Sequence, residues 1–166
     1  GLESAYYKSL QHMAGSAKDG SVLLQTMGMI IDLANLQVVT RAIIAGLKID
    51  AAQCTIAGGY LIRETTVKEL LPLKLADLPR HLEGTQYSDI AEEILIRHDR
   101  TRSITDVQDV VDKHRFKLLK EILAPRVLSP LVMLWHIIFK ETEIRNLRLI
   151  LKAINDNIPG EDIKAY

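Results

Sequence analysis

The sequence is poor in residues that stabilise small secreted or irregular folds. Cys54 is the one cysteine in 166 residues, so no intrachain disulfide can form, which is typical of a reducing compartment. Aromatic residues make up only 5%, and nine glycines and five prolines interrupt the chain. The 48% of hydrophobic residues is a normal globular share. We therefore expect one domain, or two small ones packed together, with a substantial core.

An excess of charge and long hydrophobic runs are both absent. The 21 basic residues balance 21 acidic ones, whereas a typical nucleic-acid-binding domain is strongly basic. The longest charge-free stretches, Gly20–Ile31 and Val127–Phe139, are shorter than the roughly 20 apolar residues that a membrane-spanning helix needs. The first residues lack the pattern of a signal peptide. The sequence therefore predicts no direct membrane insertion.

Apolar residues recur at helical spacing, and no sustained alternation typical of strands is present. The sequence predicts an all-α fold of multi-helix lobes with long packed helices. The expected helices are Glu3–Met13, Ser21 to about Gly46, Thr66–Leu71, Ser88 to about His98, Asp106–Leu123, and Ser129-Pro130 to about Ala153. The broken stretch Asp50–Pro79 is expected to hold short helices.

The two longest predicted helices repeat one another. Residues 31–43 align without a gap with residues 142–154, at an offset of 111. The shared polar and small positions are Asp32 and Glu143, Asn35 and Asn146, Arg41 and Lys152, Ala42 and Ala153. A carboxylate and an amide one turn apart lie on one helix face, where the amide can bond a neighbouring backbone. The repeat predicts two units, residues 1–54 and 55–166, packed together.

Three segments carry a resemblance to a known family. They are IDLANLQVVTRAIIAGL (31–47), LEGTQY (82–87) and KETEIRNLRLILKAI (140–154). Together they resemble the C subunit of the V/A-type ATP synthases, the family that includes the d subunit of the eukaryotic V-ATPase. Members are about twice this length and contain three related helical lobes, so the chain is similar to the C-terminal portion.

The resemblance implies a non-catalytic subunit of the central stalk and rotor. A protein in this role couples the central axle to the membrane proteolipid ring during ion-coupled ATP synthesis or hydrolysis. The implied partners are the axle subunits and the ring, with no nucleic acid and no cofactor, and the implied location is cytoplasmic and peripheral to the membrane. The motif residues with implied structural or interface roles are Asp32, Asn35, Arg41, Tyr87, Glu141, Glu143, Arg145, Asn146 and Arg148.

Other candidate sites lack the partners that their chemistry requires. The five histidines form no His-x-x-x-His pair, which argues against a zinc enzyme. We expect His136 to be a core or interface residue and Cys54 to be a buried structural thiol. No Lys-Ser/Thr pair follows Gly58-Gly59, so this pair predicts a turn rather than a phosphate-binding loop.

Two other function classes stay open. A helical regulatory or nucleic-acid-binding domain would use the predicted helix Asp106–Leu123, which carries five basic or imidazole side chains. These are Lys113, His114, Arg115, Lys117 and Lys120. The zero net charge argues against this class. A small helical enzyme would need converging carboxylates with shifted pKa values.

Overall fold

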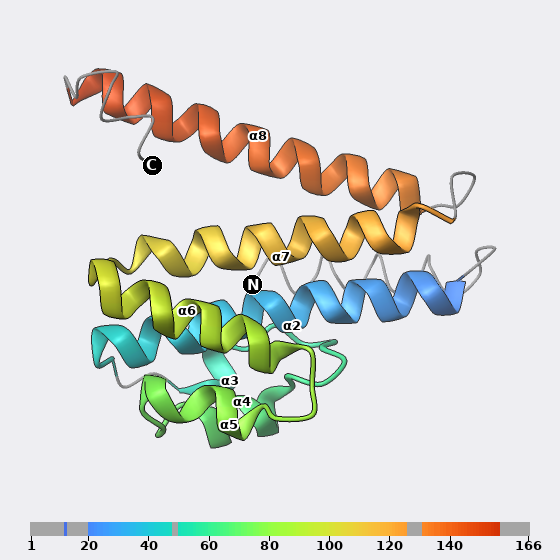
Figure 1. The fold of residues 1–166 in the computed structure, drawn as a ribbon. Helices are drawn as coiled ribbons and strands as arrows, with labels where there is room; N and C mark the ends of the chain where they lie inside the picture. The colour runs from blue at the N-terminus through green and yellow to red at the C-terminus, as the bar shows by residue number, and fades with distance from the viewer. Residues whose placement is uncertain (1–11, 13–19, 48–49, 126–130, 157–166) are drawn as a thin grey trace. The chain divides into compact units, whose positions relative to one another are not determined.

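The structure, a computed structural model, describes residue 12 and residues 20–47, 50–125 and 131–156. These residues form helices joined by loops and contain no strand, which confirms the all-α prediction (Figure 1). The chain divides into two compact units, Gly1–Pro125 and Arg126–Tyr166. The predicted division into two repeat units, residues 1–54 and 55–166, stays a prediction. The predicted helix Glu3–Met13 lies outside the described residues except for position 12.

The first unit is built around α2, Gly20–Ala45. The predicted helix from Ser21 is present, but Ser21, a residue type that favours the N-cap position and was expected there, lies inside the helix, so that expectation is wrong. The predicted stop at Gly46 is confirmed: its φ is +63°, and the N–H groups of Gly46 and Leu47 bond the carbonyls of Ile43 and Ala42 at 3.1 and 2.9 Å. This pairing caps the last turn, and glycine accepts the left-handed conformation without a Cβ clash.

α2 is the one helix in the described part of the chain that is long and apolar enough to cross a membrane. Length and composition alone do not distinguish such a span from a core helix. In this structure, 56% of its most apolar window is buried, and the buried residues include Asp32 and Asn35. α2 therefore serves as the central core helix of the first unit.

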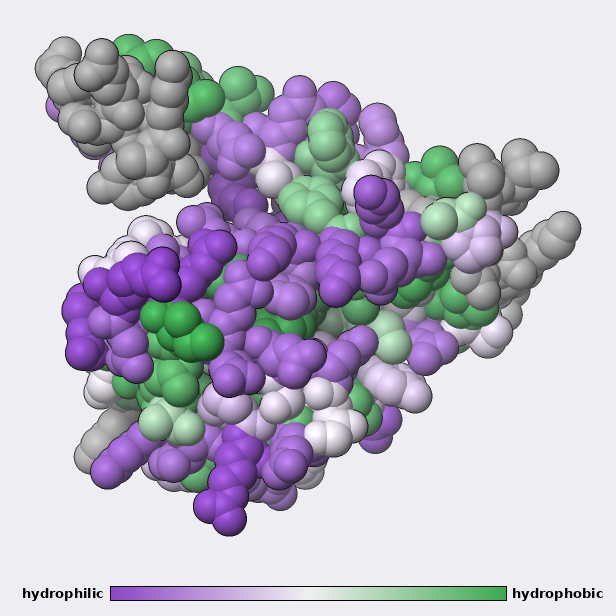
Figure 2. Space-filling view, viewed as in Figure 1, coloured by the Kyte–Doolittle hydropathy of each residue, from purple (hydrophilic) through white to green (hydrophobic). Residues whose placement is uncertain are grey.

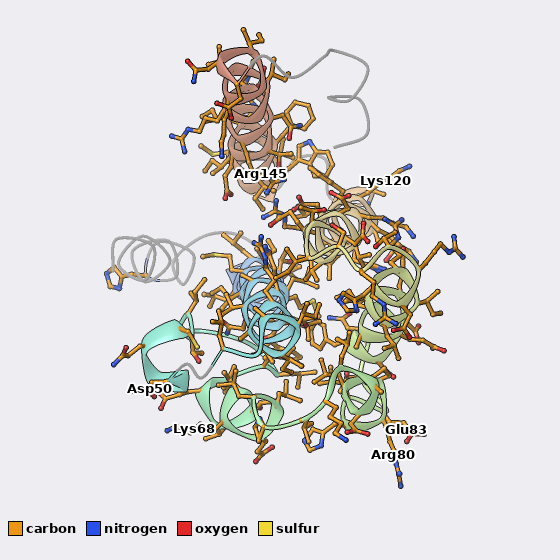
Figure 3. The ribbon with its side chains drawn as sticks, turned by 90° about the vertical axis from the view of Figure 1, so that its left-hand side faces the viewer. Asp50, Lys68, Arg80, Glu83, Lys120 and Arg145 are labelled. Carbon is orange, nitrogen blue, oxygen red and sulfur yellow. The ribbon has the colours of Figure 1, made fainter. Side chains whose placement is uncertain are left out.

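The described residues of the first unit form six further helical elements. They are α3 (Ala51–Cys54), α4 (Glu64–Leu70), the 3-10 helix η1 (Leu75–Asp77), α5 (Leu78–His81), α6 (Tyr87–Thr101) and α7 (Thr105–Leu123). α7 packs along α2, α6 packs on α7 and α5, and α4 packs on α2 and α3. In Figure 3, which looks along the long helices, side chains meet inside this unit, whereas Lys68, Arg80 and Glu83 lie on its outside.

A single apolar cluster joins these helices. Its buried members come from α2, α4, α5, α6 and α7 and from the loops between them; they include Leu33, Leu36, Val39, Ile62, Val67, Leu70, Leu78, Tyr87, Ile94, Val107 and Val110. Residues that precede the short helices in sequence and residues that follow them belong to the same cluster. The loop after α3 contributes Ile62 to this core.

The helix boundaries differ from the predicted ones by a few residues at most. α6 continues three residues past His98 because Arg102, at a φ of 56°, caps it with an N–H bond to the His98 carbonyl at 2.8 Å. α7 begins at Thr105, whose N–H bonds the Ser103 hydroxyl at 3.2 Å. Pro79 lies in the first turn of α5, where no N–H is needed.

The second unit contains α8, Leu131–Asn155. The predicted helix end near Ala153 is confirmed to within two residues, while the predicted start at Ser129-Pro130 lies outside the described residues. Many apolar side chains of α8 are exposed, and they include Met133, Phe139, Ile144, Leu147, Leu151 and Ile154.

Candidate functional site

Asp32 is a carboxylate buried in the middle of α2. Its Oδ2 accepts a hydrogen bond from the Leu61 N–H at 2.8 Å and another from the Tyr87 hydroxyl at 2.7 Å. Its Oδ1 accepts the Ile62 N–H at 2.8 Å. One side chain thus holds the loop before α4 and the first residue of α6 against α2. The sequence singled out Asp32 and Tyr87 separately but did not predict that they touch.

Asn35 lies one turn further along α2 and binds the same loop from its other end. Its Nδ2 donates to the carbonyls of Ile56 at 3.1 Å and Ile62 at 2.8 Å, and its Oδ1 accepts the Ile56 N–H at 2.8 Å. The expectation that this amide bonds a neighbouring backbone is therefore confirmed. We call Asp32 and Asn35 together the clamp, and residues 55–63 the clamped loop.

Glycines let the clamped loop approach α2 closely. A Cβ on Gly59 would lie 2.5 Å from Oδ1 of Asp32 and 2.7 Å from the Ile62 carbonyl oxygen, so no other residue fits without displacing them. Gly28 accepts the Tyr60 N–H through its carbonyl at 3.3 Å, and a Cβ on Gly28 would meet the Tyr60 Cβ at 3.1 Å. The predicted turn at Gly58-Gly59 is confirmed, with Gly58 at a φ of +102°.

The electrostatics of the clamp suit a structural role. Burial raises the pKa of Asp32, and the hydrogen bonds from Leu61, Tyr87 and Ile62 oppose that shift only in part. Burial and the hydrogen bond to Asp32 also raise the pKa of Tyr87 well above its usual range. A phenol held in this way is a poor proton donor at neutral pH. The carboxylate is enclosed by its own three donors, so the arrangement fixes main chain in place.

A second polar cluster joins α6 to α7. Glu93 binds the Lys113 ammonium at 2.8 Å, and Nε2 of His114 lies 2.8 Å from Oε2 of Glu93. Burial alone would raise the pKa of Glu93, but the bonds from Lys113 and His114 outweigh it and lower this pKa. Arg115 pairs with Asp112 at 2.7 Å. Three of the five basic side chains proposed for nucleic-acid contact are thus engaged by carboxylates, which argues against that class.

One further cavity lies beside the clamp. It has a volume of about 190 Å³, and its lining includes Leu33, Gln86, Tyr87, Asp89, Ile90, His114, Lys117, Leu118 and Glu121. Among the described residues, no group of three His, Cys, Asp or Glu side chains is arranged to hold a metal ion. The face of α6 and α7 turned to the viewer in Figure 2 is mostly hydrophilic.

The remaining predicted residues do not converge on the clamp. Arg41 is half-buried at the far end of α2. On α8, Glu141, Asn146 and Arg148 are exposed and Arg145 is half-buried. Glu143 bonds Lys140 at 2.6 Å on the same helix.

Two expectations about single residues need correction in part. His136 was expected in a core or an interface; its side chain is exposed in the second unit, so it is not a core residue there, and an interface role stays a prediction. Cys54 is half-buried at the edge of the core rather than fully buried, because it ends the short surface helix α3. Burial nevertheless raises the pKa of its thiol.

Comparison with known proteins places the chain in a family. The family model for the ATP synthase (C/AC39) subunit matches residues 1–166. The chain is 28% identical over 156 residues to the C subunit of the A-type ATP synthase of Methanobrevibacter smithii, covering 92% of this chain and 41% of that protein. It is 29% identical over 169 residues to the corresponding protein of Thermococcus kodakarensis, covering 99% of this chain and 45% of that protein.

The chain thus spans less than half the length of these curated relatives. No solved structure gives a significant match. The match of the family model over the full stretch, rather than over one motif, agrees with the three separated segments that carried the resemblance. This chain belongs to the ATP synthase (C/AC39) subunit family.

Proposed function

We propose that the chain is part of a non-catalytic central-stalk subunit of a V/A-type rotary ATPase. In this role it passes torque between the central axle and the membrane proteolipid ring, on the cytoplasmic side and without entering the bilayer. The observation that carries the proposal is the family match along the whole stretch. The relatives from Methanobrevibacter smithii and Thermococcus kodakarensis are both named as the C subunit of an A-type ATP synthase.

The geometry of the first unit supports a mechanical role. A torque-bearing part must not yield between its helices, and well-packed interiors transmit strain. The clamp ties α2, the clamped loop and α6 to one buried carboxylate through bonds of 2.7–2.8 Å. The buried polar groups of this unit thus hold main chain in place and leave no reactive group open to a substrate at the clamp.

The exposed charges of α8 offer a surface for the axle. Arg148 is exposed on this helix within the segment that resembles the family most specifically. We expect Arg148→Glu to weaken contact with an axle subunit while the helix itself stays formed, because an exposed side chain contributes little to folding.

The test uses the full-length subunit that contains this sequence. Rotary complexes that lack the subunit are reconstituted in vesicles with either the unchanged or the Arg148→Glu subunit, and ATP-driven ion uptake is measured. The unchanged subunit should restore uptake and Arg148→Glu should restore less, with equal helicity by circular dichroism. The matched control is Arg100→Glu on α6, an exposed position outside the motif. Uptake that does not depend on the subunit would refute the proposal.

A further inference from the structure

The cavity beside the clamp has an apolar inner lining from three helices. Leu33 of α2, Tyr87 and Ile90 of α6 and Leu118 of α7 form this lining. The first three are at most 5% exposed, so they belong to the packed core and hold the cavity in shape. The volume of about 190 Å³ is below the roughly 300–1,000 Å³ of sites for small molecules and cofactors. This size suits one long side chain of a protein partner.

The outer lining of the cavity carries charges without an opposite charge bound to them. Asp89 and Glu121 supply carboxylates and Lys117 supplies an ammonium, and all three residues are exposed. Within the described part of the chain, these three side chains form no ion pair or hydrogen bond. His114 also lines the cavity, but its Nε2 already lies 2.8 Å from Oε2 of Glu93. Two carboxylates and one ammonium leave an excess of negative charge at the mouth.

Glu121 lies where a carboxylate does not stabilise its own helix. α7 ends at Leu123, so Glu121 is in the last turn, where the partial negative charge of the helix end disfavours an acidic side chain. Lys120, in the same turn, is of the type that this end favours. Local helix stability therefore does not account for Glu121, whereas a cation bound in the cavity does.

Building on the proposed function, we propose that this cavity receives an arginine side chain from a neighbouring subunit of the rotary complex. The apolar lining packs against the methylene stem of the arginine. The guanidinium pairs with Asp89 and Glu121, which reach the mouth from different helices. Its planar fork of five donors serves two carboxylates better than the compact ammonium of a lysine does. An acidic side chain would meet like charge at both positions.

An arginine in this cavity is coupled directly to the clamp. It contacts Tyr87, whose hydroxyl donates to Oδ2 of Asp32 at 2.7 Å. Asp32 in turn holds the clamped loop against α2. A load on the bound subunit is thus passed to the most firmly fixed part of the first unit, as torque transmission requires.

The affinity of the full-length subunit for rotary complexes that lack it tests the proposal. The probe is the complex purified without this subunit, and the Kd is measured at one fixed salt concentration. Asp89→Asn and Glu121→Gln should each raise the Kd by about three- to tenfold, because a charge pair covered by a partner contributes more than an exposed one. Lys117→Gln should lower the Kd by about twofold or more, because it removes a like charge facing the guanidinium.

Glu92→Gln is the matched control. It removes the same charge from an exposed position of α6 that does not line the cavity, and it should leave the Kd unchanged. Asp89 lies in the first turn of α6, where a carboxylate stabilises the helix, so Asp89→Asn can also weaken the fold. Glu121→Gln separates the two effects: it should keep or raise the midpoint of urea unfolding while it weakens binding.

Photo-cross-linking identifies the occupant. The photoreactive residue p-benzoylphenylalanine, placed at the exposed position of Gln86 on the cavity wall, should cross-link in the assembled complex to an arginine-containing segment of another subunit. The proposal is overturned if Glu121→Gln leaves the Kd unchanged, if Lys117→Gln raises it, or if the cross-link joins the subunit to itself, to a segment without arginine or to nothing. Failure of the unchanged subunit to bind the complex would overturn the proposed function as well, whereas failure of the variants alone would overturn only the arginine site.

Discussion

Removal of the Asp32 carboxylate should strongly destabilise the first unit. In Asp32→Ala, the Leu61 and Ile62 N–H groups and the Tyr87 hydroxyl lose their acceptor together. Ile62 and Tyr87 are only 1% and 0% exposed, so water cannot replace the acceptor without opening the core. The stranded donors, and not the lost packing of the carboxyl group, dominate the expected cost.

The magnitude follows from the number and type of the lost bonds. A hydrogen bond to a charged group contributes about 1.5–3 kcal/mol net, and three such bonds end on Asp32. Burial of the Asp32 carboxylate is itself unfavourable and raises its pKa. The variant no longer buries this group, which offsets part of the sum. We expect the free energy of unfolding to fall by about 3–5 kcal/mol, because each buried donor left without an acceptor costs about 1–3 kcal/mol.

Urea denaturation followed by circular dichroism measures this change. The transition midpoint should fall while its slope stays constant, as for a change in stability alone. The milder variant Tyr87→Phe removes one of the three bonds, and a double-mutant cycle with Asp32→Ala should give a coupling of about 1–2 kcal/mol. The exposed Glu92→Gln serves as the control. A loss below about 1 kcal/mol for Asp32→Ala would refute the reasoning.

Other predictions follow from the same geometry. Gly59→Ala should cost about 2–4 kcal/mol of unfolding free energy by chemical denaturation, because its Cβ meets a carboxylate oxygen at 2.5 Å. Gly84→Ala, in open space at a φ of +79°, should cost only about 1 kcal/mol, and equal losses for the two variants would contradict this expectation. Glu93→Gln should weaken the loss of stability as the pH falls below 4.5, because the lowered pKa of Glu93 stabilises the fold above that value. Asp32 should affect the pH dependence of stability in the opposite direction. Its raised pKa favours the fold at low pH, and this contribution is lost as the pH rises from 3.8 through the folded pKa, so Asp32→Asn should remove that loss. The measurement is the free energy of unfolding at several pH values. A change with pH in the opposite direction would contradict the interpretation of that residue.

The features of this fold that could be predicted are those that depend on residues close in sequence. Apolar spacing predicted the long helices, and Gly46 marked the end of α2 because a left-handed residue there favours glycine. The spacing of Asp32 and Asn35 placed both on one helix face, and the backbone bonding of Asn35 followed from that. The helix end and the shared helix face depend on residues close in sequence, whereas the sequence did not indicate which segment Asn35 would bond.

The parts that sequence did not predict depend on contacts between distant segments. Tyr87 follows Asp32 by 55 positions, and nothing in either neighbourhood indicates the bond. Gly59 carries no sign of positive φ; it is required by the approach of a carboxylate from another element. Glu93 lies among other acidic residues of α6, and only the packing of α7 distinguishes it from exposed Glu92.

Calorimetric titration of the full-length subunit that contains this sequence into a purified central-axle subcomplex tests the proposed coupling role most directly. We predict saturable binding at one site, as a stalk subunit requires. Retained binding by residues 1–166 alone would place the contact within this stretch. Absence of binding by the full-length subunit at high micromolar concentration would contradict the proposed coupling role.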